Sequence, residues 1–206
     1  MNFKTIELCI ENGSLLFGDF VLKSGKTSPY FFNAAFDQGQ LLYHVAERYA
    51  DHLFLKYNSD LVNYTLFGAA YKGIPLISAI GCVLFQKYKL NCNIVFNRKE
   101  VKDHGEGGNL VGKIAHTKLI IIDDVLTRGT ALLQVFDMIK VNAPGASIER
   151  AVVLLDRMEK VENTTARLHL KKSTLIEIDA IISLMDLVNY LEKEDKDTHV
   201  KMLSYL

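Results

Sequence analysis

The feature that most constrains the fold is residues 119–131, which read LIIIDDVLTRGTA. Four apolar residues come first, three of them β-branched, and so short an apolar run is typical of a strand buried on both faces. Asp123 and Asp124 follow directly, and then come small, hydroxyl-bearing residues and a glycine. From Leu132 onward apolar residues recur at helical spacing. The stretch therefore predicts a strand, a tight loop and a helix with Thr130 as its N-cap.

A junction of this kind is suited to binding a phosphate, because the first N–H groups of a helix are exposed and its dipole favours negative charge. The paired acids beside it are suited to binding ribose hydroxyls or to helping hold a metal. The chain contains neither GxxxxGK[ST] nor GxGxxG, which excludes the P-loop and the dinucleotide-binding fingerprint. Two adjacent acids after a strand, taken alone, are more simply interpreted as the solvated end of that strand. The acids, the loop and the helix start occur together here, and this combination favours a ligand site.

Three further strands are expected to end in charged residues. Residues 61–67 form the first, and its loop GAAYKG carries Lys72 into a helix opened by Ile74-Pro75, with proline in the first turn. A plain connection with a solvated lysine is the alternative for this loop. Residues 93–97 and 148–155 form the other two strands, which are followed by Arg98 and by Arg157.

The other elements are expected from apolar spacing and from turn residues. Helices are predicted at residues 3–11, 40–56 and 184–194, the last with a capping-box-like start at Ser183 and Asp186. The chain should be strand-like and then turn-like over residues 20–30, irregular over 158–173 and a last strand over 175–182. Residues 101–110 are glycine-rich and charged, which indicates a mobile surface loop or a closing lid.

Strands and helices alternate along the chain, so the predicted fold class is α/β with a mostly parallel central sheet flanked by helices. In such sheets ligands bind outside the C-terminal ends of the strands. The charged residues named above all lie at or just past such ends. Their convergence on one edge indicates a single anion-binding site.

Composition limits the partners. The 206 residues suffice for one domain with a sizeable core, and 24 basic residues balance 24 acidic ones. No overall field therefore favours nucleic acid or an anionic membrane, and an anion site must be local. Glu7 and Glu11 interrupt the N-terminal apolar pattern, which argues against a signal peptide, and no apolar run approaches membrane-spanning length. Cys9, Cys82 and Cys92 show no CxxC spacing and are expected to be buried, reduced thiols of a cytosolic protein.

The stretch at residues 119–131 resembles the phosphoribosyl-diphosphate signature of the type I phosphoribosyltransferases. Four further segments, KSGKTSPYFFNA, LFGAAYKGIP, FNRKEVKDHGEGGNLVG and LLDR, resemble the orotate phosphoribosyltransferases within that family. They run in the family's order from about residue 20 to residue 157. The resemblance implies one domain over residues 1–206, with the N-terminal segment of about residues 1–40 contributing to a small base-binding hood.

The resemblance also implies an activity and its partners. The expected reaction joins orotate and phosphoribosyl diphosphate to give orotidine 5′-monophosphate and pyrophosphate. Mg²⁺ is expected as cofactor, held mainly through the diphosphate and not directly by the protein. The family implies a cytoplasmic homodimer whose lid loop is shared across subunits, with no nucleic-acid or membrane partner.

Residue roles follow from the same resemblance. Catalysis is expected from Lys102, His104 and Asp124. Phosphoribosyl diphosphate is expected to contact Lys23, Tyr71, Lys72, Arg98, Lys99, Lys102, His104, Asp123, Asp124, Val125, Leu126, Thr127, Arg128, Gly129, Thr130 and Ala131. Orotate is expected to contact Phe31, Phe32, Thr127 and Arg157, with Lys23 at the same site.

Two positions depart from the commonest family pattern. Arg128 stands where a small residue is usual, and either adds a contact to the 5′-phosphate or points into solvent. Ala69 stands where proline is frequent.

Two alternative functions remain at this stage. A related enzyme for a neutral base is disfavoured because Arg157 offers the fork geometry of a carboxylate partner. A non-catalytic regulator on the same fold is disfavoured because Lys102 and His104 are present and no basic face or added domain is evident.

Overall fold

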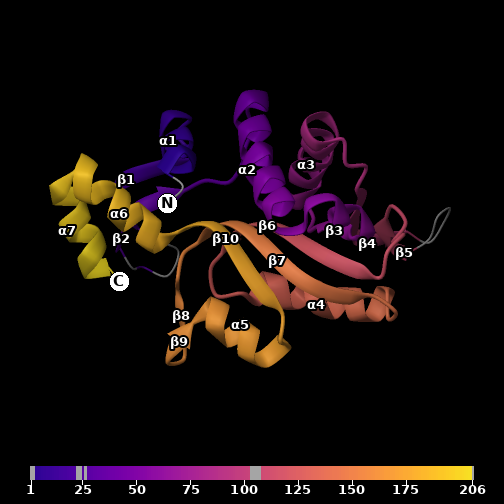
Figure 1. Cartoon of the computed structure of the whole chain (residues 1–206). Helices are drawn as coiled ribbons and strands as arrows, with labels where there is room; N and C mark the ends of the chain where they lie inside the picture. The colour runs from indigo at the N-terminus through magenta and orange to yellow at the C-terminus, as the bar shows by residue number, and fades with distance from the viewer. Residues whose placement is uncertain (1–2, 22–24, 26, 103–107, 206) are drawn as a thin grey trace.

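The computed structural model describes residues 3–21, 25, 27–102 and 108–205, and for residues 99–102 and 108 it describes only the backbone. A six-stranded sheet forms its centre, with strand order β10-β7-β6-β3-β4-β5 (Figure 1). All neighbouring strands in it are parallel except β4 and β5. The strands are β3 (Thr65–Gly68), β4 (Asn93–Lys102), β5 (Gly108–Val111), β6 (Lys118–Leu126), β7 (Ser147–Asp156) and β10 (Glu177–Ser183). The predicted α/β class with a mostly parallel sheet is confirmed.

Helices cover both faces of the sheet. α2 (Gly39–Tyr57) and α3 (Gly73–Tyr88) lie above it in Figure 1, and α4 (Thr130–Asn142) and α5 (Ala166–Thr174) lie below it. Side chains of β6 alternate between the two faces of the sheet. Ile120 and Ile122 join the larger core, which also contains residues of α2 and α3, and Leu119 and Ile121 join the smaller core on the side of α4 and α5. The prediction of a strand buried on both faces is therefore correct.

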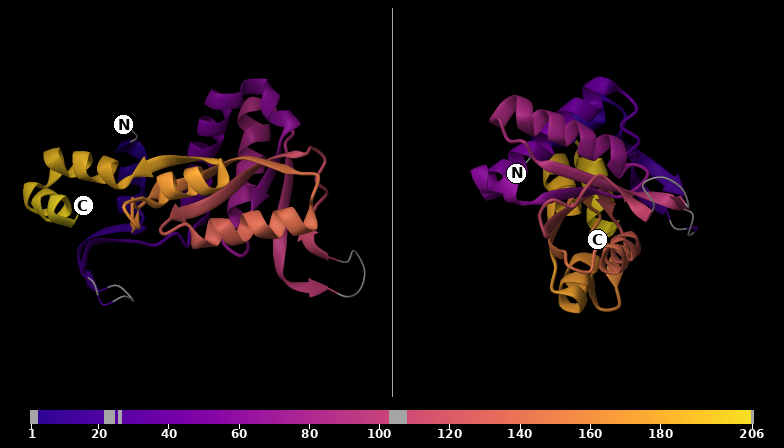
Figure 2. Two further views of the ribbon diagram at one scale, coloured as in Figure 1. Left: turned by 90° about the horizontal axis from the view of Figure 1, so that it is seen from below. Right: turned by 90° about the vertical axis from the view of Figure 1, so that its right-hand side faces the viewer.

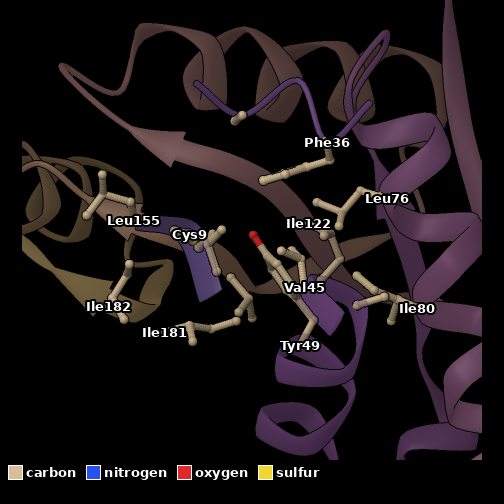
Figure 3. Packing of buried hydrophobic residues seen from close by; sticks show 14 of the residues in the cluster. Cys9, Phe36, Val45, Tyr49, Leu76, Ile80, Ile122, Leu155, Ile181 and Ile182 are labelled. Carbon is tan, nitrogen blue, oxygen red and sulfur yellow. The ribbon is translucent and has the colours of Figure 1, made fainter. Parts of the chain in front are cut away.

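Tyr49 of α2 links the larger core to the strand that carries the acids. Its ring is fully buried, and Figure 3 shows it among Val45, Ile122 and Ile181. A phenol buried among apolar side chains needs a hydrogen-bond partner, and the Tyr49 hydroxyl donates to the backbone carbonyl of Asp123 at 2.7 Å. This bond fixes the β6 backbone where the acidic pair begins.

The two ends of the chain come together beside the sheet. The N-terminal part is α1 (Phe3–Glu11) with the antiparallel hairpin β1 (Leu15–Val21) and β2 (Thr27–Phe32); the C-terminal part is α6 (Leu184–Glu194) and α7 (Lys196–Tyr205). Both parts lie at the left of Figure 1, and edge-to-face ring pairs join them: Phe3 with Tyr190, and Tyr30 with Tyr205. The predicted α1 and α6 are confirmed, including the capping box of Ser183.

Several predicted elements differ in the structure. Of residues 20–30, Phe20 and Val21 lie in β1 as the predicted strand, but residues 27–30 lie in β2, so the expected turn is wrong there. Residues 61–67 are not one strand, because the 3₁₀ helix η1 (Asn58–Asn63) precedes β3. Residues 158–173 are not irregular: they contain β8 (Lys160–Val161), β9 (Thr164–Thr165) and most of α5.

The polar composition of α5 and α7 explains why the sequence pattern does not predict these two helices. In α5 only Ala166 and Leu170 are buried, so the helix has too few apolar residues for a clear period, although Thr165 caps its start. In α7, which the sequence did not predict, Met202 is the one buried residue. Such short elements depend on tertiary packing more than on their own pattern.

The predicted surface loop at residues 101–110 is wrong at both ends. β4 continues to Lys102, β5 begins at Gly108, and these two residues are paired in the antiparallel register. Residues 103–107, with His104, lie outside the described part of the chain. In the left view of Figure 2 the β1–β2 and β4–β5 hairpins project toward the same side of the molecule, at its opposite ends.

The three thiols are free, but they are not all buried. Cys9 is buried, Cys92 is half-buried and Cys82 is exposed, so the expectation of buried thiols is wrong for Cys82. Burial raises the pKa of the Cys9 thiol to about 12. None of the described helices is both long enough and apolar enough to span a bilayer.

Candidate active site

A cavity of about 540 Å³ opens past the end of β3, where residues of β4 and β6 flank it. Its size is that of a small-molecule site. The predicted residues that line it are Tyr71, Lys72, Arg98, Asp123, Asp124 and Ala131. The structure thus brings together the loop after β3, side chains of β4 and β6, and the first turn of α4, at one edge of the parallel sheet. The predicted strand over residues 93–97 continues to Lys102, so Arg98 lies within β4 and not after it.

The acidic pair lies inside β6, not after it as predicted. The strand is longer than its apolar run because it continues to pair with β7, with Asp123 opposite Val153. Each carboxylate is held by the next backbone N–H. Asp123 Oδ1 accepts from Asp124 at 2.9 Å, and Asp124 Oδ1 accepts from Val125 at 2.8 Å. Both acids are therefore oriented before any ligand binds.

Lys72 crosses the cavity to the acidic pair. Its Nζ lies 3.0 Å from Asp124 Oδ2, and its side chain is 57% exposed whereas that of Asp124 is 13% exposed. The interpretation of a merely solvated lysine is therefore wrong. A pair this open contributes at most about 1 kcal/mol to folding, so its place at the cavity matters more than its stability.

Asp123 has an unusual ionisation. Burial, and then the neighbouring charge of Asp124, raise the pKa of the Asp123 carboxyl to about 7, while Lys72 acts in the opposite direction. A group with this pKa is partly protonated at neutral pH. The two adjacent acids thus present less negative charge than their formal sum.

Asn97 is a lining residue that the sequence prediction missed. Its Oδ1 accepts from the backbone N–H of Ala70 at 2.8 Å, which fixes the loop that carries Tyr71 and Lys72. The signal was available, because Asn97 directly follows the apolar run of β4 and precedes Arg98. The further missed lining residues are Ala69, Ala70, Asn109, Gln134, Val135 and Met138.

The loop between β6 and α4 differs from its prediction in one respect. The N-cap of α4 is Gly129, at φ +83°, and Thr130 is the first helical residue, so Thr130 as N-cap is wrong. The helix begins without a side-chain cap, which leaves N–H groups of its first turn for a ligand. Thr127, Arg128 and Thr130 are exposed.

Leu126 and Val125 differ from the exposed residues of this loop. The Leu126 side chain is buried in the core under α4, and its carbonyl accepts from the N–H of Arg157 at 3.0 Å. Val125 is half-buried and packs against the other core. Leu126 can therefore offer a phosphate only its backbone.

Arg157 directly follows β7 and is held against Tyr30, a residue that the prediction missed. Arg157 Nε donates to the Tyr30 hydroxyl at 3.0 Å, and the guanidinium carbon lies 5.1 Å from the centre of the Tyr30 ring. Glu159 Oε1 lies 3.4 Å from the same Nε. Arg157 Nη2 is buried and has no hydrogen-bond partner among the described residues. That nitrogen is a donor suited to an anionic ligand.

Phe31 and Phe32 point in different directions, since neighbours on a strand alternate. Phe31 is 43% exposed and lies 5.6 Å from the Phe20 ring, measured between centroids. Phe32 packs against the larger core. The two rings do not present one common face.

The remaining predicted residues stand apart from the cavity or beyond the described chain. Phe31, Phe32, Arg157 and residues 125–130 are not among the described residues that line it. Lys23 and His104 lie outside the described residues. Lys99 and Lys102 are placed in β4 by their backbone alone.

Comparison with known proteins gives consistent matches, although no protein-family model matches the chain. It is 44% identical over 204 residues to the orotate phosphoribosyltransferase of Acinetobacter baumannii (strain ACICU), covering 97% of this chain and 92% of that protein. It is 41% identical over 194 residues to the orotate phosphoribosyltransferase of Aeromonas salmonicida (strain A449), covering 93% and 87%. Among solved structures, the orotate phosphoribosyltransferase of Francisella tularensis superposes with a TM-score of 0.83 at 35% identity, covering 98% and 96% of the two chains.

Proposed function

The chain belongs to the orotate phosphoribosyltransferase family, which makes it a glycosyltransferase of pyrimidine biosynthesis, and we propose that the cavity at the end of its parallel strands is where phosphoribosyl diphosphate reacts with orotate. The observation that carries this assignment is the meeting of two oriented carboxylates and the cation of Lys72 in one cavity, which Ala131 in the first turn of the uncapped helix α4 also lines. The carboxylates suit ribose hydroxyls, and the helix start suits a phosphate.

In this proposal Asp124 and Asp123 accept hydrogen bonds from the ribose hydroxyls. The partial protonation of Asp123 allows it to donate as well as to accept. Residues 127–131 hold the 5′-phosphate through backbone N–H groups and the hydroxyls of Thr127 and Thr130. The Arg128 side chain is exposed, which is compatible with a contact to the 5′-phosphate and also with an orientation into solvent.

The diphosphate is assigned to the cationic side of the cavity. Lys72 uses one donor on Asp124, and an ammonium has three, so two remain for phosphate oxygens. Arg98 lines the same cavity. Pyrophosphate gains negative charge as its bond to C1′ breaks, so cations aimed at it stabilise the transition state more than the ground state. Lys99, Lys102 and His104 are assigned to the same role by resemblance.

Mg²⁺ is proposed as cofactor. The described residues hold no group of three or more His, Cys, Asp or Glu side chains placed to bind a metal, and Asp124 is already paired with Lys72. This donor set fits an ion that arrives on the diphosphate and keeps most of its ligands there. When bound, Mg²⁺ would neutralise charge on the diphosphate.

Orotate is a planar anion, and Arg157 is proposed to bind its carboxylate. The buried, unpartnered Nη2 of Arg157 supports this assignment. The exposed ring of Phe31 is proposed to contact the base, whereas Phe32 supports the strand from the core side. Thr127 and Lys23 are assigned to orotate by resemblance.

Base choice tests the assignment. With Mg²⁺ and phosphoribosyl diphosphate, the chain should consume orotate and leave uracil and hypoxanthine at background. Arg157→Ala should lower kcat/KM for orotate, because a charged hydrogen-bond pair is lost. The corresponding activation free energy should rise by on the order of 2–4 kcal/mol. Product formation followed by chromatography measures both. Equal turnover of uracil would contradict carboxylate recognition.

Three further properties rest on the resemblance. The hood is assigned to the β1–β2 hairpin and α1, and their packing against α6 and α7 supports a compact unit over residues 1–206. A homodimer with a lid shared between subunits is proposed, with Lys102 and His104 on the lid. The expected cytoplasmic location stays a prediction.

A further inference from the structure

We propose that Tyr30 is a positioning residue for base recognition, which holds the Arg157 guanidinium so that its Nη edge faces the carboxylate of the substrate. The inference deepens the proposed function, because it assumes that Arg157 meets an anionic base. None of the roles assigned above includes Tyr30.

The geometry uses two contacts between the same two side chains. The Tyr30 hydroxyl accepts from Arg157 Nε at 3.0 Å, and the Arg157 guanidinium carbon lies 5.1 Å from the ring centre. One contact fixes the Nε side of the guanidinium, and the other restricts its tilt. Nη2, which is buried and unpartnered among the described residues, is a donor that this arrangement leaves for a ligand. The arrangement thus determines which edge of the Arg157 guanidinium faces the ligand.

Tyr30 is rigid enough for this task. It is fully buried in the larger core, and its ring meets that of Tyr205 edge-to-face at 6.0 Å. Its backbone carbonyl accepts from Ser28 Oγ at 2.8 Å. Tyr205 lies on α7, so the C-terminal helix supports the site through Tyr30 (Figure 1). An arginine side chain has many rotamers, and a fixed partner reduces the entropy lost when a ligand binds.

Tyr30 does not neutralise the positive charge of Arg157. Burial raises the pKa of the Tyr30 phenol to about 12, so it stays neutral at physiological pH. Glu159, the other partner of Nε, is a carboxylate and lies further away, at 3.4 Å. A neutral acceptor orients the guanidinium without cancelling the charge that attracts an anion.

The test compares Tyr30→Phe with a matched control elsewhere in the chain. Tyr57 accepts from Arg150 Nε at 3.3 Å, so Tyr57→Phe removes the same kind of contact outside the proposed site. Tyr30→Phe should raise KM for orotate about tenfold, in the range expected for a hydrogen bond to a charged group, and leave KM for phosphoribosyl diphosphate unchanged. Tyr57→Phe should change neither value. Thermal melting should show that both variants fold.

A binding measurement separates positioning from a structural role. Orotidine 5′-monophosphate carries the carboxylate and uridine 5′-monophosphate lacks it, so calorimetry should show that Tyr30→Phe weakens only the former. Equal weakening of both would assign Tyr30 a structural role and overturn the proposal. Unchanged binding of both, with an active wild type, would overturn it and leave the proposed function standing. If the wild type does not distinguish the two nucleotides, both proposals fall.

Arg157→Lys tests the same point without altering the core. Lysine keeps the charge but cannot bond Tyr30 through one nitrogen and the ligand through another. The proposal expects Arg157→Lys to lose the preference for orotidine 5′-monophosphate. Retention of the wild-type preference would show that charge alone suffices and that orientation by Tyr30 is unnecessary.

Discussion

At the scale of single residues, the adjacent acids Asp123 and Asp124 differ in their interactions. Asp124 faces Lys72 across the cavity, and this ion pair places it beside the diphosphate side of the proposed site. Burial of the Asp123 carboxyl is the main reason that its pKa is raised. Asp123 is therefore a group whose ionisation costs folding free energy.

The raised pKa of Asp123 predicts a pH-dependent stability. The folded state binds this proton more tightly than the unfolded state, so the free energy of unfolding falls as pH rises from about 4 to about 7, and the loss persists above that range. Asp123→Asn, which cannot ionise, should be more stable than the wild type at about pH 8 by on the order of 1–3 kcal/mol. The gain should vanish near pH 4. Urea denaturation across this range measures it.

Asp124→Asn is the matched control for this prediction. It loses an exposed ion pair with Lys72 and should be no more stable than the wild type. A stability gap between Asp123→Asn and the wild type that did not change with pH would mean that the Asp123 carboxylate is ionised and well solvated in the folded protein.

At the scale of elements, the turn from β6 into α4 depends on packing from a distant helix. Gly129 adopts φ +83°, and a Cβ built there would lie 2.5 Å from Leu170 Cδ1 of α5. The backbone conformation and the contact both exclude a side chain. The proposed phosphate loop therefore has its shape fixed partly by α5.

Gly129→Ala should damage this turn in two ways. The left-handed backbone and the contact with Leu170 should together lower the free energy of unfolding by about 2–4 kcal/mol. KM for phosphoribosyl diphosphate should rise, because the N–H groups of the turn are displaced. Gly145→Ala is the control, since its Cβ would meet nothing within 4 Å. If Gly129→Ala and Gly145→Ala had the same melting temperature, the close contact between Gly129 and Leu170 would be refuted.

At the scale of the whole molecule, the β4–β5 hairpin lies at the end of the sheet opposite to the hood (Figures 1 and 2). β5 is one of the two edge strands of the sheet, and among the described strands its partner is β4. A hairpin that leaves the body at an edge is well placed to contact a second copy of the chain. This arrangement supports the proposal that Lys102 acts in the partner's site.

Subunit mixing tests the shared lid. Lys102→Ala and Asp124→Asn should each be inactive, the first through the lid and the second through the ribose site. When they are mixed under conditions that exchange subunits, half of the dimers should be mixed, and each mixed dimer should have one complete site. About a quarter of wild-type activity should return for a two-fold dimer.

The control for this experiment is proof of exchange, for example by native mass spectrometry of differently tagged subunits. If exchange is complete and activity stays absent, the lid closes over its own subunit. Melting of Asp124→Asn at the wild-type temperature would show that its loss of activity is not a loss of fold.

Patterns within a short stretch of sequence determined much of this protein. The apolar run of β6, the buried face of α4 and the capping box at Ser183 were predictable, because strand period, helix period and cap chemistry act over a few residues. The edge where Lys72, Arg98 and the acids meet was predictable as well. Parallel strands place their C-terminal ends together whatever the details of packing.

Tertiary structure alone decided the features that depend on distant partners. Tyr30 and Arg157 are 127 residues apart, and no local pattern pairs them. The cap at Gly129 needs Leu170 of α5, the separate directions of Phe31 and Phe32 need the β1–β2 hairpin, and α7 needs the hood. Local rules cannot supply these contacts, because each one gains its free energy from burial against a surface that exists only after the chain has folded.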